Sequence, residues 1–123
     1  MIKTLESKII AEYQVDTDTF MIELHHHKFF NKTKFLELLD CCEKLIELYR
    51  IQKSKNYVEI AHSIIFLMQW VLLENVYHLS HDDLSHIKNY DSLLEEVDMS
   101  GVYNSFLNYS IDRIRIISTD IIV

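Results

Sequence analysis

Glycine and proline are almost missing from this chain of 123 residues, which contains one Gly and no Pro. Sheets and loop-rich folds depend on these residues at their turns, so the composition favours helices joined by short polar loops. Because Gly101 is the only glycine, a Gly-rich phosphate-binding loop or dinucleotide-binding fingerprint is impossible. Hydrophobic residues make up 49% of the chain, enough for a core. We therefore expect one all-α domain that covers residues 1–123.

Cysteine is scarce as well. Cys41 and Cys42 are adjacent on a predicted helix and cannot form an ordinary disulfide with each other. No Cys–His–Asp arrangement accompanies them, so we interpret them as small buried residues. No signal peptide is recognisable, and the apolar run at residues 64–73 is too short to span a bilayer. The sequence thus predicts a cytoplasmic protein with reduced thiols.

Basic residues are nearly absent from one part of the chain. Residues 61–100 contain seven acidic residues and one basic residue, Lys88, and the whole chain has a net charge of -7. A field of this sign repels nucleic acid and anionic membranes and attracts basic proteins. We therefore expect neither nucleic-acid nor membrane binding. An ordinary solvated acidic face is the alternative interpretation.

Hydrophobic periodicity predicts a bundle of about five to six helices. The first covers residues 2–13, and Asp16, Thr17 or Asp18 caps a short second helix that ends near His27. The piece TFMIEL (residues 19–24) has a strand as its alternative. The remaining predicted helices begin after Asn31 or Thr33, after Asn56, after Ser80, and near Tyr103. The tail, residues 112–123, is rich in β-branched residues, so an extended end is an alternative there.

The predicted helix at residues 56–79 is the most hydrophobic part of the chain, and we expect the bundle to form around it. One side is apolar and should close the core. This side consists of Ile60, Ile64, Leu67, Met68, Val71, Leu72 and Val76. The other side mixes aromatic and polar residues, which core packing alone does not explain, so it is either a second, partly polar packing surface or a partner-binding surface. It includes Glu59, His62, Phe66, Trp70, Glu74 and Tyr77.

Histidines provide two candidate metal sites. His78, Asp82 and His86 have a spacing that places metal ligands on one face of a continuous helix. However, the cap signal at Ser80 starts a new helix between His78 and Asp82, so a structural or surface role is the better interpretation. The run at residues 25–27 is predicted to be a surface run. We expect no metal and no cofactor.

The second candidate consists of His62, His81, Asp82 and Asp112. Their order resembles the H…HD…D pattern of the HD-type metal phosphohydrolases, which are all-helical. The resemblance implies that these four residues bind a divalent metal that activates water. Here the doublet follows a polar turn, HLS, whereas in that family it follows an apolar helical run. The hypothesis of such an enzyme therefore rests on four residues.

The stretch HDDLSHIKNYDSLLEEVD, residues 81–98, combines Tyr90 with several carboxylates. In this stretch, and in size, acidity and lack of Gly and Pro, the chain resembles small bacterial immunity proteins of the contact-dependent inhibition and bacteriocin types. The resemblance rests on overall profile and on no family motif. It implies a cytoplasmic protein, not an enzyme, that binds and neutralises one toxin domain, for instance a basic nuclease.

We predict a binding face in which acidic side chains speed encounter and aromatic side chains anchor the contact. Its residues are Asp82, Asp83, Tyr90, Asp91, Glu95, Glu96, Trp70 and Tyr77. A helical adaptor or homo-oligomerising module that uses the aromatic side of the helix at residues 56–79 is the alternative. The HD-type hydrolase is the second alternative.

Overall fold

The computed structural model describes residues 1–79, 86–99 and 102–122. Its elements are α1 (Ile2–Tyr13), α2 (Phe20–His27), α3 (Lys32–Ile51), α4 (Tyr57–His78), the short 3-10 helix η2 (Tyr90–Leu94), strands β1 (Glu96–Met99) and β2 (Val102–Ser105), and α5 (Phe106–Asp120). The fold is an all-α helical bundle, as the sequence predicts. The two strands add a small antiparallel hairpin beside it, in which Glu96 pairs with Ser105 and Met99 with Val102.

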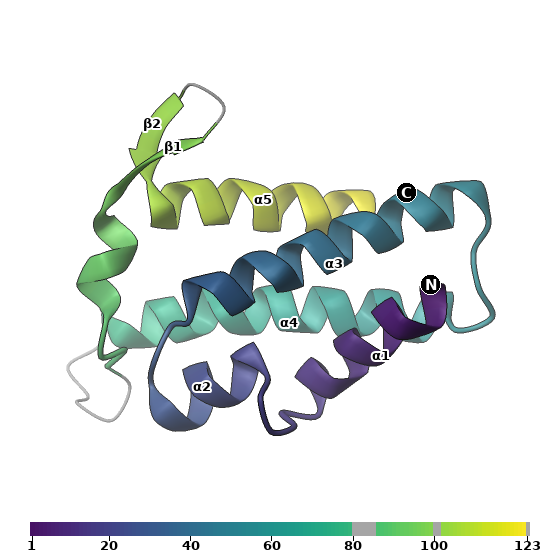
Figure 1. The fold of residues 1–123 in the computed structure, drawn as a ribbon, viewed down its shortest axis with the longest axis horizontal. Helices are drawn as coiled ribbons and strands as arrows, with labels where there is room; N and C mark the ends of the chain where they lie inside the picture. The colour runs from purple at the N-terminus through teal and green to yellow at the C-terminus, as the bar shows by residue number, and fades with distance from the viewer. Residues whose placement is uncertain (80–85, 100–101, 123) are drawn as a thin grey trace.

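The helices form two layers (Figure 1). Helices α5, α4 and the α1–α2 pair lie side by side, and α3 crosses over the front of this row, where it contacts α1, α2 and α5. Helix α4 therefore runs through the middle of the row, as expected for the central helix. In this view α3 passes in front of α4, and Phe66, Leu73 and Tyr77 of α4 are exposed, so one side of α4 faces solvent.

Aromatic residues from distant parts of the chain fill the core beside the start of α3. Phe35 is fully buried and packs with ring centroids 4.9 Å from Phe30 and 5.0 Å from Phe20. Phe106, the first residue of α5, lies 6.3 Å from Phe35. Such tilted and edge-to-face contacts are favourable arrangements for aromatic rings. They join α2, α3 and α5 at the end of the molecule where η2 also packs.

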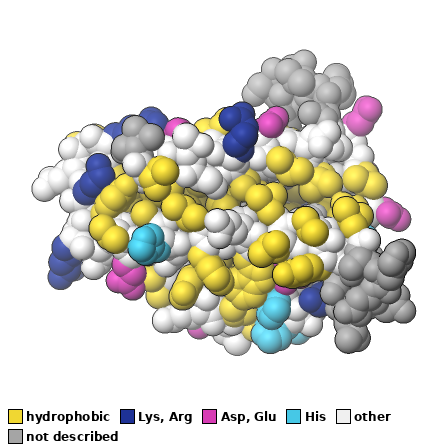
Figure 2. All heavy atoms as spheres, turned by 180° about the vertical axis from the view of Figure 1, so that it is seen from behind, with side chains coloured by type: hydrophobic (Ala, Val, Ile, Leu, Met, Phe, Trp, Pro, Cys, Tyr) yellow, Lys and Arg dark blue, Asp and Glu magenta, His cyan; other side chains and the backbone are white. Residues whose placement is uncertain are grey.

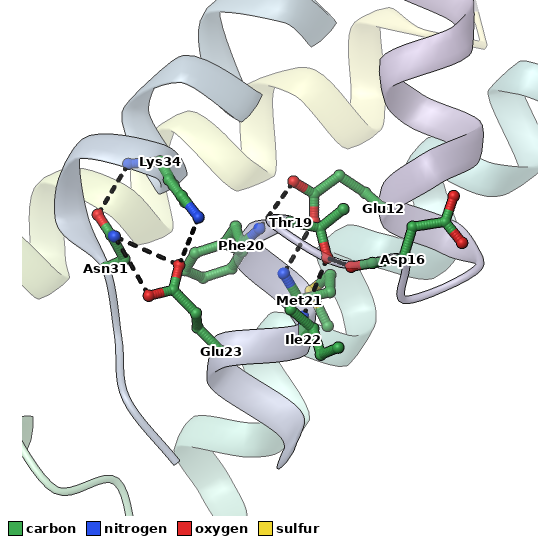
Figure 3. A network of polar contacts seen from close by, with 9 residues as sticks. All are labelled: Glu12, Asp16, Thr19, Phe20, Met21, Ile22, Glu23, Asn31 and Lys34. Atoms are coloured by element: carbon green, nitrogen blue, oxygen red, sulfur yellow. Dashed lines mark hydrogen bonds and ion pairs between the residues drawn. The ribbon is translucent and has the colours of Figure 1, made fainter. Parts of the chain in front are cut away.

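The N-terminus of α2 is held by a carboxylate from α1 (Figure 3). Glu12 accepts hydrogen bonds from the backbone N–H groups of Phe20, at 2.9 Å, and Met21, at 2.8 Å. Burial raises the pKa of Glu12, although these two hydrogen bonds oppose the shift. Thr19, one residue after the predicted capping residues, accepts a hydrogen bond from the N–H of Ile22. The sequence therefore located this helix correctly but placed its cap too early.

The N-termini of α3 and α4 lie next to the capping residues predicted from the sequence. Asn31 caps α3 by accepting a hydrogen bond from the N–H of Lys34 at 3.1 Å. Asn56 precedes α4 but makes no capping hydrogen bond with its side chain. Helix α5 begins at Phe106 and continues to Asp120, so most of the tail is helical and not extended.

The helix predicted to follow Ser80 is wrong in the part that the structure describes, where η2 and β1 replace it. Asn89 explains the difference, because its side chain bonds to the backbone of Phe30. Its Oδ1 accepts from the Phe30 N–H and its Nδ2 donates to the Phe30 carbonyl, both at 2.8 Å. This pairing fixes residues 86–90 against the α2–α3 connection, which a straight helix could not follow. The Ser80 cap itself lies outside the described residues.

Among the described residues, one helix, α4, is long enough and apolar enough to cross a membrane. Buried core helices of soluble proteins meet the same two criteria. In this structure, 44% of its most apolar stretch is buried inside the protein. Ile64, Leu67 and Met68 are fully buried, as predicted for the core side. Val76 is 59% exposed, so its assignment to the core is wrong. It lies near the end of the helix, on the wall of a pocket between α4 and α5.

Candidate functional site

Large apolar side chains run in a line along the open side of α4. Phe66, Trp70, Leu73 and Tyr77 follow one another at spacings of four, three and four residues, which places them on one helical face. Phe66, Leu73 and Tyr77 are 44%, 46% and 48% exposed, and Tyr13 from α1 is 45% exposed. We call these five residues the α4 ridge. Figure 2 shows hydrophobic side chains spread across this face of the molecule.

The aromatic rings of the α4 ridge support one another. The rings of Tyr13 and Phe66 meet edge to face with centroids 5.1 Å apart, and those of Phe66 and Trp70 with centroids 5.4 Å apart. Trp70 also contacts the ring of His25 from α2 at 4.9 Å. The rings of Tyr13, Phe66 and Trp70 are therefore each restrained by a neighbour before any partner binds.

A buried carboxylate fixes the tryptophan of the ridge. Glu74 is 2% exposed, and its Oε1 accepts a hydrogen bond from Trp70 Nε1 at 3.1 Å and lies 2.9 Å from His25 Nδ1. Its Oε2 lies 3.5 Å from Lys28 Nζ. We call these four residues the Glu74 cluster. The sequence placed Glu74 on the mixed side of the helix but did not reveal that α2 covers it.

Two members of the Glu74 cluster come from the end of α2. Lys28 follows the helix in the left-handed conformation with φ of 55°, a position that usually holds glycine. A glycine at position 28 would adopt this conformation without strain, but it would leave Glu74 without the positive charge of Lys28. His26 and His27 are exposed, as predicted for a surface run, but His25 contacts Glu74 and Trp70. The side chain of His25 is 41% exposed, so His25 also lies at the surface, where it packs against Trp70.

The C-terminal end of the ridge meets η2 through stacked rings. His78 and Tyr90 stack with centroids 3.8 Å apart and an interplanar angle of 11°. His78 Nδ1 accepts a hydrogen bond from the Ile87 N–H at 2.9 Å, and the His86 ring lies 4.9 Å away. Burial lowers the pKa of His78, and the nearby His86 lowers it further. His78 therefore has a structural role, and because α4 ends at this residue, His78 and His86 do not lie on one helix.

The structure describes Tyr90, Asp91, Glu95 and Glu96 of the predicted acidic face. Asp91, Glu95 and Glu96 are exposed, and Glu95 pairs with Lys32 at 3.8 Å. Tyr90 is half-buried under its contact with His78. The structure thus brings the acidic segment to the end of α4 that carries Tyr77. The predicted residues Asp82 and Asp83 lie outside the described residues.

The residues of the metal hypothesis are not assembled in the described part of the chain. No group of three or more His, Cys, Asp or Glu side chains suited to hold a metal ion occurs there. His62 is exposed on α4 and Asp112 is exposed on α5. His81 and Asp82 lie outside the described residues.

The two cysteines belong to the core. Cys41 is 6% exposed and Cys42 is fully buried. Burial raises the pKa of the Cys41 thiol to about 11 and that of Cys42 well above its ordinary value. Because the thiolate is the nucleophilic form, neither side chain is prepared for nucleophilic chemistry at neutral pH.

Comparisons with protein-family models, with curated proteins and with solved structures find no match to this chain. The α4 ridge, the Glu74 cluster and the acidic residues of η2 and β1 are therefore interpreted from their own geometry.

His78 should make the stability of the protein depend on pH. Its pKa is lowered in the folded state, so the unfolded chain binds the proton more readily and the free energy of unfolding should fall as pH drops below the ordinary value of 6.5. In His78→Asn, an amide oxygen can accept the Ile87 N–H at any pH. Urea unfolding at pH 7.5 and pH 5.5 should show a smaller loss for this variant. His62→Asn, at an exposed histidine of the same helix, is the control, and a loss in His78→Asn equal to that of the control would contradict the assignment.

Proposed function

We propose that this protein is an inhibitory binding protein of the immunity type, which covers a basic toxin domain with the α4 ridge and the acidic residues beside it. The ridge is the observation that carries the proposal. Phe66, Leu73 and Tyr77 are each 44–48% exposed in one line, on a helix whose other side is core. Exposed apolar surface of this kind is typical of protein interaction sites.

The composition and rigidity of the ridge favour a protein partner. Tryptophan and tyrosine are the residue types most enriched among side chains that dominate binding energy. Trp70 is held by Glu74, and Phe66 is held between Tyr13 and Trp70. Side chains that are already ordered lose little conformational entropy on binding, which favours affinity.

Charge at both ends of the ridge favours a basic partner. At one end, Tyr13, Phe66, His62 and the exposed Glu59 line a hollow of about 430 Å³. Aromatic walls beside a carboxylate suit the side chain of a lysine or arginine, which binds ring faces as well as opposite charge. At the other end lie the exposed carboxylates of η2 and β1. Both ends would steer a basic protein toward the ridge.

The product of the reading frame next to this gene is the partner to test, by calorimetric titration and by rescue of cells that express it. Phe66→Ala and Tyr77→Ala should each weaken binding by at least tenfold, as truncation of a central aromatic contact does. Ile51→Ala is the matched control, because Ile51 is 84% exposed at the end of α3 and should not affect affinity. Unchanged affinity in both ridge variants would exclude the ridge as the binding surface.

The acidic end is tested separately by the double substitution Asp91→Lys with Glu95→Lys. Reversal of these exposed charges should slow association and make it less sensitive to salt, with a smaller effect on dissociation. Glu37→Lys, an exposed charge reversal on α3, is the control. An unchanged association rate would show that Asp91 and Glu95 are not part of the interface. The ridge variants would then test whether the ridge alone binds the partner.

A helical adaptor that pairs with a second copy of itself is the second candidate, because the same exposed ridge would be covered in a dimer. Light scattering of the purified chain distinguishes the two. A dimer that dissociates in Phe66→Ala favours self-association, whereas a monomer that binds the neighbouring gene product favours inhibition.

A further inference from the structure

The pocket between α4 and α5 has a volume of about 390 Å³ and shares no residue with the α4 ridge. It reaches the core, because Phe30, Phe35 and Phe106 are among its lining residues and are all buried. Val76 of α4 and Ile111 of α5 also line it and are 59% and 40% exposed, so a molecule from solvent can enter. Its size and apolar lining are those of a small-molecule site.

An apolar volume of this size is unusual beside a protein core. Protein interiors are packed as tightly as organic crystals, and voids larger than a water molecule are few. The rings of Phe30, Phe35 and Phe106 lie with centroids 4.9, 6.1 and 6.3 Å apart in their three pairs, which restrains them from turning into the space. The atoms that line the pocket therefore lack dispersion contacts that a bound molecule would supply.

The lining determines which kind of molecule can bind. No charged side chain is among the described residues that form it, and the surface that it presents is almost wholly apolar. Asn75 and Ser110 belong to the lining, but their side-chain oxygens are buried out of reach of a molecule in the pocket, and Asn75 Nδ2 donates to the Val71 carbonyl at 2.8 Å. A bound molecule therefore contacts carbon almost everywhere, and any polar group that it carries inside loses its hydrogen bonds to water.

We propose that this pocket binds a small neutral molecule of hydrocarbon character, with no polar group in its buried part. A carboxylate or phosphate would lose its hydration there without gaining a cation. A peptide segment is disfavoured for a similar reason, because every residue brings a backbone C=O, and nearly every one an N–H, that must keep a hydrogen-bond partner. The site is independent of the partner-binding function proposed above.

Three probes that share one bicyclic frame test the ligand class: indene, indole and indene-3-carboxylate. Indole differs from indene mainly by an N–H group, which would be buried without an acceptor. We therefore expect indene to bind more tightly than indole by about fivefold or more, and indene-3-carboxylate not to bind measurably. Calorimetry gives the affinities, and NMR shifts of the methyl groups of Val71 and Ile114, two buried lining residues, report the location. Indole binding as tightly as indene, no binding of indene, or indene binding without shifts of these methyl groups would overturn the proposal.

Tryptophan substitutions at the rim test the location a second time. Ile111→Trp and Val76→Trp should each lower the affinity for indene by about tenfold or more, because the added ring takes up part of the pocket and leaves part of the ligand in water. Ile116→Trp and Val58→Trp are the matched controls, since Ile116 on α5 and Val58 on α4 are 46% and 65% exposed but do not line the pocket. Both controls should bind indene as the wild type does. All four positions are exposed, so the variants should fold, which circular dichroism checks. Unchanged affinity for indene in both rim variants would also overturn the proposal.

Discussion

Replacement of Lys28 by methionine should destabilise the protein by about 2 kcal/mol, because it leaves the buried Glu74 carboxylate without its cation. Glu74 is 2% exposed, so water cannot replace the lost partner. The figure is below the usual cost of breaking a fully buried pair, because the side chain of Lys28 is 26% exposed and its charge is partly screened. Methionine keeps the length of the side chain and its Cβ, so the left-handed backbone is not relieved.

Replacement of the other partner, Glu74, should destabilise the protein less than replacement of Lys28. In Glu74→Leu, Lys28 can extend into water, and the main loss is the acceptor for Trp70 Nε1, which costs about 1 kcal/mol. Urea unfolding of the two single variants and the double variant at pH 8, above the ordinary pKa range of histidine, completes the cycle. We expect the double variant to be more stable than Lys28→Met alone. Additive losses would show that the two charges do not interact.

Replacement of Glu6 by alanine should cost about 3 kcal/mol, since two side chains lose their acceptor together. Glu6 is 6% exposed on α1 and accepts hydrogen bonds from the hydroxyl of Tyr49 and, at 2.6 Å, from that of Ser54. Tyr49 is 4% exposed, so its hydroxyl would remain buried without a partner. These contacts fasten the end of α3 and the loop after it to α1.

Glu6→Gln and pH distinguish the acceptor from its charge. Glutamine keeps one acceptor oxygen, so the loss should be about 1 kcal/mol. Burial alone would raise the pKa of Glu6, but hydrogen bonds from Ser54, Tyr49 and Asn56 together outweigh it and lower the pKa. The contribution of Glu6 is therefore complete above the ordinary value of 4.5 and is lost as pH falls below it. Equal pH dependence in the wild type and Glu6→Gln, measured by urea unfolding between pH 6 and pH 3, would contradict this role. Glu37→Ala is the exposed control.

The local sequence was sufficient for most of the helices. Helix α1 has the predicted bounds, α2 ends at His27, and Asn31 caps α3. Helical periodicity and capping depend on residues three or four positions apart, so they can be read without knowledge of the fold. The same patterns placed Phe66, Trp70 and Tyr77 on one face and identified that face as different from the core.

The tertiary structure decided which faces are covered. Periodicity states that one side of a helix is polar, but not whether another element lies against it. For that reason the sequence placed Glu74 on the mixed side of its helix and His25 in a surface run, but did not reveal that Glu74 is buried and that α2 brings His25 into contact with it. The segment after α4 was misread for a similar reason, because Asn89 bonds to a backbone 59 residues away. The sequence by itself determined a helical bundle with a mixed face on its most hydrophobic helix. Only the packing of distant segments, which no local pattern records, decided that this face presents an aromatic ridge held from below by a buried carboxylate.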